Sequence, residues 1–433
     1  MQIVIAGGGP VGIFTALSLT RRGHDVRVVD RDPGPPPQGP WARAGVMQFL
    51  HPHGYRAAVR HALRAELPDV YEALLAAGAE VRPMPGLPEP VFGMWCRRSV
   101  FERTLRLAAR REPRLRWITG HVDRVVVDHG TVRGLVVDGT LLRGDITVVA
   151  TGRASRLGDE LRGDVEGGAC GFAYLTRMYQ ARPGQPGCEL PAPNYAPGPG
   201  YFSLVLPQDA GTHSVLLSYP SNAAEFAALR TTAGFERAVA AIPALAAFVD
   251  DDRFAPITDV LVGGNLTNTY RLQGPALGRP PARGLFFLGD AVATLNPAAG
   301  RYLALALPHA QQLVAALDGP DPDLDGASRR LDDWAEANIR PWFEDHVRWD
   351  RSLLRRFAGE GLDLTEPIPS DVICAAVAVE PSLAPLVGPY LGMLAPPSVL
   401  DAAQERVRAL LAQGWRPPLT GPTAADITAL VSA

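Results

Sequence analysis

The sequence predicts an α/β protein with a doubly wound parallel sheet, an inserted antiparallel sheet and a helical C-terminal region. Three observations predict this fold class. An apolar run at the N-terminus is followed by a glycine-rich turn and a helical apolar pattern, as at the start of a βαβ unit. A central region has several apolar runs of strand length around a Pro- and Gly-rich loop at residues 183–200. From about residue 326 onward, apolar residues recur at helical spacing.

The composition is that of a globular protein long enough for two or three domains. The chain has 433 residues, 47% of them hydrophobic, and its 42 basic and 45 acidic side chains leave a net charge of −3. This balance makes nucleic acid or an anionic membrane an unexpected partner. The sequence contains no lysine, so all 42 basic residues are arginines. That excludes a Schiff-base enzyme and a P-loop, because both depend on a lysine amine.

The cysteines indicate neither a metal site nor a disulfide framework. No two of them have C-x-x-C spacing and none has a neighbouring pair of histidines; they are Cys96, Cys170, Cys188 and Cys374. The apolar run in MQIVIAGGG is too short for a signal sequence, and no stretch approaches the roughly 18 apolar residues of a membrane span. We therefore expect a soluble, cytoplasmic protein with no metal and no membrane insertion.

The first elements are a strand, a turn, a helix and a second strand. Gln2 to Ala6 is the first strand, and the helical pattern after the glycine-rich turn ends at Gly23. The run DVRVV that starts at Asp25 is the second strand, and it ends at Asp30. This order predicts the first half-unit of a doubly wound sheet.

A surface loop and three helices are expected next. Residues 32–40 contain too many prolines for a regular element. Helices are predicted at about 53–63, 68–77 and 99–110, with a strand at 91–96. Ser99 is the expected N-cap of the last helix, with Glu102 as its capping-box partner.

Turn signals divide the next region into a meander and a second sheet. His129-Gly130 and Asp138-Gly139 separate three strand-like runs, which predicts a small antiparallel meander inserted in the parallel sheet. The later apolar runs at 171–179, 201–207 and 214–220 predict a second sheet with one buried face and one face toward a cavity. Its expected helical cover is 223–229 and 235–248, before a strand at 284–290 returns to the first sheet and a helix follows at 303–317.

Gly7, Gly9 and Gly12 form a G-x-G-x-x-G dinucleotide fingerprint. The glycines permit a tight turn, close approach of a pyrophosphate to main-chain N–H groups, and packing of the helix on the strand. Asp30, 18 residues after Gly12, is placed to accept hydrogen bonds from a ribose. The predicted nucleotide site also includes the neighbouring Pro10, Val11 and Arg31. The fingerprint does not separate NAD from FAD.

A second motif, LGDAVATLNPAAGRYLALAL at residues 288–307, separates these two cofactors. Asp290 can accept a hydrogen bond from a ribityl hydroxyl, and a helix that begins near Pro297 to Gly300 directs its N–H groups toward a flavin ring. With the fingerprint, this motif resembles the FAD-dependent monooxygenases of the aromatic hydroxylase (group A flavoprotein) superfamily, epoxidase/oxygenase-like subgroup. The resemblance implies a Rossmann-type, GR2-like FAD-binding domain. It places these residues at FAD: Gly289, Asp290, Pro297, Gly300, Arg301 and Tyr302.

Two further stretches extend the resemblance. Residues 41–53 are similar to the R-x-G-V-x-Q-x-x-H-x-H loop of some flavoprotein epoxidases and oxygenases, and residues 98–105 are similar to a segment whose arginine reaches FAD. The resemblance implies that Arg43, Gln48 and Arg98 contact the cofactor. It also implies that the main chain of Val122 lies at the adenine. His51 and His53 lack a third ligand, so we favour a loop role for them over metal binding.

The resemblance also implies a division into domains. The FAD-binding domain is expected to be discontinuous, at residues 1–75, 96–166 and 270–325. The substrate domain is expected at 76–95 and 167–269, and the helical C-terminal region at 326–433.

The sequence departs from the superfamily pattern at two positions. The usual Asp-Gly pair, which is implicated in FAD and NADPH handling, is replaced at Thr151-Gly152. The usual second glycine after Gly300 is Tyr302, whose ring is expected to crowd, or to stack near, the pyrimidine side of the flavin and so to alter flavin mobility. Flavin-dependent halogenases share the scaffold but need a catalytic lysine and a Trp-rich signature, and neither occurs in this sequence.

The resemblance implies an FAD-dependent monooxygenase that hydroxylates or epoxidises a hydrophobic small molecule with O₂, through a flavin C4a-hydroperoxide. The expected catalytic residues are Asn296, Tyr201 and His213, and Ser203 and Ser218 are further candidates for the cavity wall. Electrons are expected from NAD(P)H or from a partner flavin reductase. Two alternatives stay open: a flavin-dependent reductase or dehydrogenase of C–C bonds, and a redox-neutral cyclase with structural FAD. The Arg-, Ala-, Gly- and Pro-rich composition suggests specialised metabolism in a bacterium.

Overall fold

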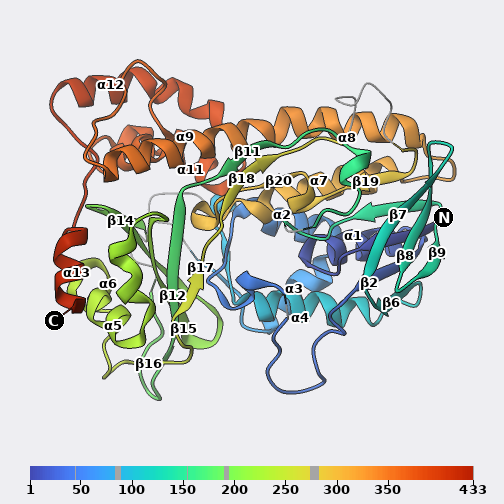
Figure 1. The fold of residues 1–433 in the computed structure, drawn as a ribbon, viewed down its shortest axis with the longest axis horizontal. Coiled ribbons are helices and arrows are strands. Elements are labelled where there is room, and N and C mark those ends of the chain that lie inside the picture. The colour runs from blue at the N-terminus through green and yellow to red at the C-terminus, as the bar shows by residue number, and fades with distance from the viewer. Residues whose placement is uncertain (44, 83–88, 154, 190–194, 274–281, 433) are drawn as a thin grey trace.

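A five-stranded parallel sheet forms the centre of the part of the molecule that carries the N-terminus (Figure 1). The computed structural model describes residues 1–433 except 44, 83–88, 154, 190–194, 274–281 and 433. The strand order is β19-β10-β1-β2-β6. The strands are β1 Gln2–Ala6, β2 Asp25–Asp30, β6 Leu115–Thr119, β10 Ile146–Val149 and β19 Leu285–Phe287. With the antiparallel sheets and the C-terminal helices, this sheet confirms the predicted fold class.

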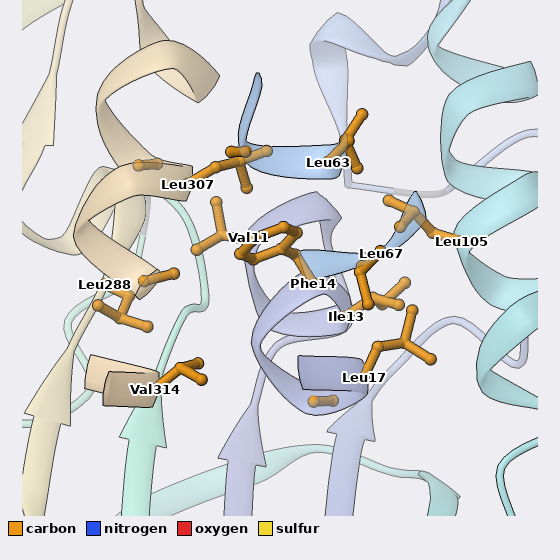
Figure 2. Close-up of a cluster of buried hydrophobic side chains, with 14 of the residues drawn as sticks. Val11, Ile13, Phe14, Leu17, Leu63, Leu67, Leu105, Leu288, Leu307 and Val314 are labelled. Atoms are coloured by element: carbon orange, nitrogen blue, oxygen red, sulfur yellow. The ribbon is translucent and has the colours of Figure 1, made fainter. Parts of the chain in front are cut away.

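Alternate residues of the parallel strands supply two separate cores. Ile3 and Ile5 of β1 pack in the first core with the helices on one face, whereas Val4 and Ala6 pack in the second core on the opposite face. The helices of the first core are α1 Pro10–Arg21, α2 Ala57–Glu66, α3 Pro68–Ala76, α4 Arg98–Ala109 and α7 Tyr302–Ala316. Figure 2 shows Phe14 of α1 among the leucines of these neighbouring helices.

The register of the parallel strands brings their carboxyl ends level. Ala6 pairs with Val29 on one side and with Val149 on the other, and Val149 pairs with Phe287. The segments that follow these residues therefore leave the sheet at one edge. They are the glycine fingerprint, the end of β2, residues 150–152 and the start of the second motif at residues 288–300, which we call the second glycine corner.

The predicted antiparallel meander is confirmed on the second face of the parallel sheet. Its strands are β7 Val122–Asp128, β8 Thr131–Val137 and β9 Thr140–Arg143. Both turns have positive φ at their two central residues, 46° and 73° at His129-Gly130 and 47° and 78° at Asp138-Gly139. This is the geometry that type I′ hairpins require.

A second, antiparallel sheet forms the other half of the molecule, and it is also confirmed. Its order is β13-β14-β15-β12-β16, with β17 paired to β12. The strands are β12 Phe172–Ala181, β13 Tyr195–Gly198, β14 Tyr201–Pro207, β15 Thr212–Pro220, β16 Phe254–Pro256 and β17 Leu261–Gly263. One face packs against α5 Thr232–Ala241, α6 Pro243–Ala246 and α13 Ala424–Ser432, which lie together in Figure 1.

The C-terminal helices extend along both halves of the molecule (Figure 1). They are α8 Leu324–Asn338, α9 Arg340–Phe357, α10 Ser370–Ala376, α11 Ala384–Gly392 and α12 Gln404–Ala412. Helix α9 packs on a linking sheet of β11 Glu166–Ala169, β18 Thr267–Tyr270 and β20 Ala293–Thr294. A third small sheet contains β3 Gly54–Tyr55, β4 Glu80–Val81 and β5 Met94–Trp95.

Several predicted boundaries are wrong. Helix α2 begins at Ala57 because the preceding residues form β3, and the helix expected over 235–248 is divided at Pro243. The segment at 224–230 is a 3₁₀ helix. The region predicted as loop at 183–200 ends in strand β13, whereas 190–194 lie outside the described residues.

The predicted capping box at Ser99 is also wrong. Helix α4 begins at Arg98 with Arg97 as its N-cap, and no side chain makes the cap hydrogen bond. Glu102 instead forms ion pairs with Arg98 and Arg43. A buried carboxylate between two guanidinium groups is held more strongly than one at an exposed helix start.

Replacing Phe14 by alanine tests the first core. Phe14 is fully buried, so Phe14→Ala is expected to lower the free energy of unfolding by about 3–5 kcal/mol. Denaturant unfolding of the purified variant measures this loss. Leu107→Ala on the exposed side of α4 is the control and should change stability by less than about 0.5 kcal/mol. Equal losses for the two variants would contradict the assignment of Phe14 to the core.

Candidate functional site

The two glycine-bearing corners meet at the carboxyl edge of the parallel sheet. A methyl group placed on Gly289 would lie 3.3 Å from Cγ2 of Val11 in the fingerprint helix and 3.0 Å from the hydroxyl of Tyr302. The two motifs are separated by about 280 residues in sequence, and the strand register described above brings them together.

The fingerprint glycines have distinct steric roles. Gly7 has φ +102°, and a Cβ on it would lie 2.3 Å from the Ala150 carbonyl oxygen. A Cβ on Gly12 would lie 1.9 Å from the Gly7 carbonyl oxygen, so helix and strand are in close contact there. Gly9 is open by comparison, since the nearest described atom to its Cβ position is Arg43 Nη1 at 4.0 Å. With Pro10 at the first turn of α1, this open side is suited to a phosphate group.

A buried chain of ion pairs lies beside the fingerprint. Arg43 bridges two carboxylates, with Nη2 2.8 Å from Asp30 Oδ2 and Nη1 2.6 Å from Glu102 Oε2. Glu102 is fully buried and also accepts from Arg98 Nε. Burial opposes charge on both arginines, but the carboxylates raise the pKa of Arg43 and of Arg98 above the usual value. The predicted residues Arg43, Arg98 and Asp30 thus form one charged unit.

A cavity of about 1030 Å³ lies between the second glycine corner, the antiparallel sheet and the C-terminal helices. Gln48, Arg98, Asp290 and the residues from Asn296 to Leu303 line it on the side of the glycine corner. The antiparallel sheet contributes mainly apolar side chains, namely Tyr174, Phe202, Leu204, Leu206, Leu216 and Ser218. Such a mixture is typical of a small-molecule site, in which few polar groups orient an apolar ligand.

Asp290 fits the role predicted for a flavin ribityl contact. Its carboxylate lines the cavity and accepts from the main-chain N–H of Arg153. Burial raises its pKa to about 6, against the lowering influence of the arginine charges at Arg98 and Arg153. A buried carboxylate with acceptor capacity that faces the cavity is suited to a ligand hydroxyl.

Tyr302 stands between the fingerprint and the cavity. It lines the cavity, and its hydroxyl lies 3.0 Å from the position that a methyl group on Gly289 would take. Burial, and secondly the charge of Asp290, raise the pKa of this phenol well above its usual value, so it stays protonated. The ring thus lies at the junction of the two glycine corners, where Gly9, Asp290 and the turn at 297–300 fit FAD.

Asn296 lines the cavity but its side chain is already engaged. Its Oδ1 accepts from the N–H of Ala298 at 3.2 Å, and its Nδ2 donates to Asp350 Oδ1 at 3.0 Å. Asn268 holds the other oxygen of Asp350 at 2.7 Å. Burial raises the pKa of Asp350 to about 7. These bonds make Asn296 a positioning residue for the turn at 297–300, and its catalytic role stays a prediction.

Tyr201 and His213 are wrongly predicted as cavity residues. Tyr201 belongs to the core under α5, α6 and α13, on the opposite face of the antiparallel sheet. His213 stacks on Tyr179 and bonds the carbonyl oxygen of Phe248 at 2.6 Å on that same side. The side chains of a strand alternate between faces, so a shift of one position decides which of them meet the cavity. Of the two serines, Ser218 lines the cavity and Ser203 is absent from its wall.

Three other predicted residues have specific surroundings. Arg301 lines the cavity, but its guanidinium pairs with Asp345 at 2.8 Å and is thus not free for a cofactor phosphate. Arg31 is exposed next to Gly45. Val122 starts β7 near the edge where the N–H of Gly120 donates to the Asp30 carbonyl oxygen at 3.1 Å. Its proposed contact with adenine stays a prediction.

The cavity also contains charged residues that the sequence analysis missed. Arg56 donates through Nε to the Ala299 carbonyl oxygen at 2.9 Å and so fixes the turn before Gly300. Arg153, Arg356 and Asp371 also line the wall. None of them belongs to a recognised local motif, although Arg153 follows a strand end, where ligand-binding residues often lie.

The described part of the chain shows neither a cluster of metal ligands nor a membrane-spanning helix. Over the described residues, no three His, Cys, Asp or Glu side chains gather as a metal site would require. His51 and His53 line the cavity, and burial lowers their pKa values to about 4 and about 3. Within the same part of the chain, none of the helices is long and apolar enough to cross a bilayer.

Comparison with known proteins supports the flavoprotein interpretation of the N-terminal region. Residues 2–122 match the family model described as FAD dependent oxidoreductase. A D-amino acid dehydrogenase of Rhizobium johnstonii is 45% identical over 49 residues, 11% of this chain and 12% of that protein. D-amino acid dehydrogenase 2 of Ralstonia nicotianae is 34% identical over 113 residues, 24% of this chain and 25% of that protein. The chain therefore matches a quarter or less of the length of these curated relatives.

Three solved structures share the fold over most of the chain. One, described as pqsL, a probable FAD-dependent monooxygenase from Pseudomonas aeruginosa, has TM-score 0.62 and 20% identity, covering 83% of this chain and 98% of that one. The flavin-dependent brominase Bmp2 has TM-score 0.66 and 14% identity, covering 95% and 99%. The Diels-Alderase PyrE3 of pyrroindomycin biosynthesis has TM-score 0.59 and 21% identity, covering 90% and 79%.

These findings agree on the N-terminal region and on the fold. Residues 2–122 match the FAD dependent oxidoreductase model, and most of the chain has the fold of the flavin-dependent monooxygenase structures. The predicted fold of a flavin-dependent monooxygenase is thereby confirmed.

The charge on Asp290 gives a prediction for the flavin-free protein. A carboxyl group whose pKa is raised from 3.8 to about 6 binds its proton more tightly in the folded state, so stability falls as the pH rises between these values. Asp290→Asn removes this loss and is expected to stabilise the protein at pH 7 by at most about 3 kcal/mol, but not at pH 4. Thermal unfolding of both proteins across this pH range measures the difference. An equal effect at both pH values would contradict the prediction.

The position of Tyr302 gives a prediction for cofactor affinity. Tyr302→Ala removes the ring at the junction of the two glycine corners, so FAD is expected to bind about tenfold more tightly, or about 1.4 kcal/mol. Quenching of flavin fluorescence on titration with the flavin-free protein measures the dissociation constant. Tyr302→Phe keeps the ring and is the control, with affinity close to that of the unmodified protein. Unchanged or weaker binding by the alanine variant would show that the ring does not obstruct FAD.

Proposed function

We propose that the protein is an FAD-dependent monooxygenase that hydroxylates or epoxidises a hydrophobic small molecule. The observation that carries this proposal is the large, mainly apolar cavity that borders the second glycine corner and the Asp290 carboxylate. The similarity to the fold of flavin-dependent monooxygenases supports it. FAD, when bound, would supply the reductive activation of O₂ and the transfer of one oxygen atom.

The residues of this chain would bind and orient rather than react. Asp290 would accept from a ribityl hydroxyl, and Gly9 would admit the diphosphate to the N-terminus of α1. Arg56 and Asn296 would hold the turn at 297–300 beside the flavin. The leucines of the antiparallel sheet would exclude water from the substrate, which limits loss of reducing equivalents as peroxide.

The source of electrons is part of the proposal. Thr151 replaces the acidic residue of the family motif, and Tyr302 replaces a glycine. Both changes favour either a partner flavin reductase or an NAD(P)H site unlike the usual one. We place the enzyme in the cytoplasm, where its four free cysteines would stay reduced.

A second candidate function is a redox-neutral cyclase in which FAD is structural. The similarity of the fold to that of the Diels-Alderase PyrE3 favours it, as does the ring of Tyr302 beside Asp290. A third candidate function is a flavin-dependent dehydrogenase of C–C bonds. The match to D-amino acid dehydrogenases covers 11% of the chain, so it supports the flavin-binding part of this candidate and not the reaction.

Oxygen labelling separates these functions. The FAD-loaded protein is photoreduced without air and then mixed with oxygen-18 gas and indole, styrene or naphthalene. The monooxygenase proposal expects one labelled oxygen atom in an organic product, detected by mass spectrometry. Free FAD reduced in the same way is the control.

Two outcomes would contradict the monooxygenase. Bleaching of the oxidised flavin by one of these compounds in the absence of air would favour the dehydrogenase. If all of the consumed oxygen appears as hydrogen peroxide with each of the three compounds, and none appears in an organic product, the cyclase becomes the better proposal. Anaerobic mixing with NADPH separately identifies the electron source, since rapid bleaching would exclude the need for a partner reductase.

A further inference from the structure

Two buried amides and a buried carboxylate meet beside the turn at 297–300. Asn296 immediately precedes this turn, Asn268 comes from β18 and Asp350 comes from α9. All three residues are buried. They belong to separate elements of the chain, so only the tertiary structure brings them together. We call these three residues the amide–carboxylate triad.

Two main-chain N–H groups fix the orientation of both amides. The N–H of Asn296 donates to Asn268 Oδ1 at 2.7 Å, and the N–H of Ala298 donates to Asn296 Oδ1 at 3.2 Å. Because each amide oxygen already faces a donor, turning either amide over would place an NH₂ group against an N–H group. The two Nδ2 atoms therefore have to point away from these N–H groups.

Asp350 accepts from both amide nitrogens. Asn296 Nδ2 donates to Asp350 Oδ1 at 3.0 Å, and Asn268 Nδ2 donates to Asp350 Oδ2 at 2.7 Å. Two donors that cannot turn away require two acceptors, which an ionised carboxylate has and a carboxamide does not. The main chain of the turn thus determines, through two asparagines, that position 350 has to carry a carboxylate.

Asp350 differs from its neighbour Asp345 on the same helix. Asp345 pairs with Arg301 at 2.8 Å. Within the described residues, Asp350 has no arginine at ion-pair distance, and His346, 3.8 Å away, is neutral because burial lowers its pKa well below the usual value. A buried carboxylate without a cationic partner is costly. Its presence is therefore explained by the two amide donors and not by the packing of α9.

The turn that the triad holds faces the cavity. The residues from Asn296 to Gly300 line the cavity, whereas Asn268 and Asp350 lie outside its wall. Helix α7 begins at Tyr302, just after the turn, and its first N–H groups have no partners within the helix. The orientation of the turn therefore sets the direction of these N–H groups. The two outer members of the triad can act on a ligand only through Asn296.

We propose that Asn268 and Asp350 are positioning residues for the flavin, which act through Asn296 on the turn at 297–300 and on the start of α7. Helix N–H groups stabilise negative charge, and a reduced flavin carries more negative charge than an oxidised one. A turn held in place therefore favours the reduced form over the oxidised form. This inference rests on the proposed function in one respect, namely that the flavin ring lies beside this turn.

Asp350→Asn tests the triad by replacing one oxygen atom with an NH₂ group. This group faces one of the two amide nitrogens, so the turn loses its fixed orientation. FAD is expected to bind at least tenfold more weakly. Reduced FAD is expected to lose a further tenfold, which lowers the two-electron reduction potential by about 30 mV. Flavin fluorescence and titration against a redox dye measure the two quantities at pH 8.5, where Asp350 is ionised because burial raises its pKa only to about 7.

The double variant Asn268→Asp with Asp350→Asn restores the hydrogen-bond pattern. The carboxylate at position 268 accepts from the N–H of Asn296 and from the amide at position 350, whose oxygen accepts from Asn296 Nδ2. The affinity for FAD and the potential should therefore return close to the values of the unmodified protein. Because the pattern is complete, this variant tests the proposal even if the single variant does not fold.

Asp332→Asn is the matched control. Asp332 is a buried carboxylate of α8 that accepts from the main-chain N–H of Gln273 at 3.3 Å and lies outside the cavity wall. The same substitution there should leave the affinity for FAD and the potential unchanged.

Four results would overturn the proposal. Unchanged affinity and potential in Asp350→Asn would show that the turn does not depend on the triad. A rise in potential would show that Asp350 acts through its negative charge instead of through the turn. A double variant as impaired as the single one would exclude the hydrogen-bond pattern as the cause. Failure of the unmodified protein to bind FAD would contradict both this inference and the proposed function, whereas failed oxygen labelling with intact FAD binding would contradict the proposed function alone.

Discussion

The register of the central parallel sheet is the constraint on which the site depends. Because Ala6, Val29, Val149 and Phe287 are level, four chain segments leave the sheet at one edge and face each other. A slip of one residue would exchange the two faces of a strand and move its apolar side chains between the two cores. The burial of both faces of the sheet therefore holds the fingerprint against the second glycine corner, and no local motif could do so alone.

Charge is arranged differently at the two sides of the cavity. Beside the fingerprint, Glu102 is buried between Arg43 and Arg98, and Asp30 extends this chain to the N–H of Gly8. A guanidinium suits this role because its planar donors can serve two carboxylates at once. On the side of the C-terminal helices, Asp345 has an arginine partner, whereas Asp350 is held by two amides.

The cavity results from the meeting of three layers that are remote in sequence. The glycine corner supplies its polar side, the antiparallel sheet its apolar wall, and α9 and α10 a second polar side. Tyr302 lies at the junction of the second glycine corner and the fingerprint. This one side chain therefore affects how a cofactor could extend from the fingerprint to the cavity. The polar and apolar parts of the cavity wall are thereby supplied by separate elements.

Local sequence determined the elements whose conformation depends on near neighbours. The first strand, the fingerprint turn and α1 are confirmed, as are the hairpin turns at His129-Gly130 and Asp138-Gly139, because glycine positions and apolar periods act over a few residues. Tertiary structure decided the rest. It turned Tyr201 and His213 away from the cavity, gave Glu102 arginine partners in place of a cap, and brought Arg356 to Asp371. Each of these outcomes depends on which strand or helix packs opposite, and that partner is distant in sequence.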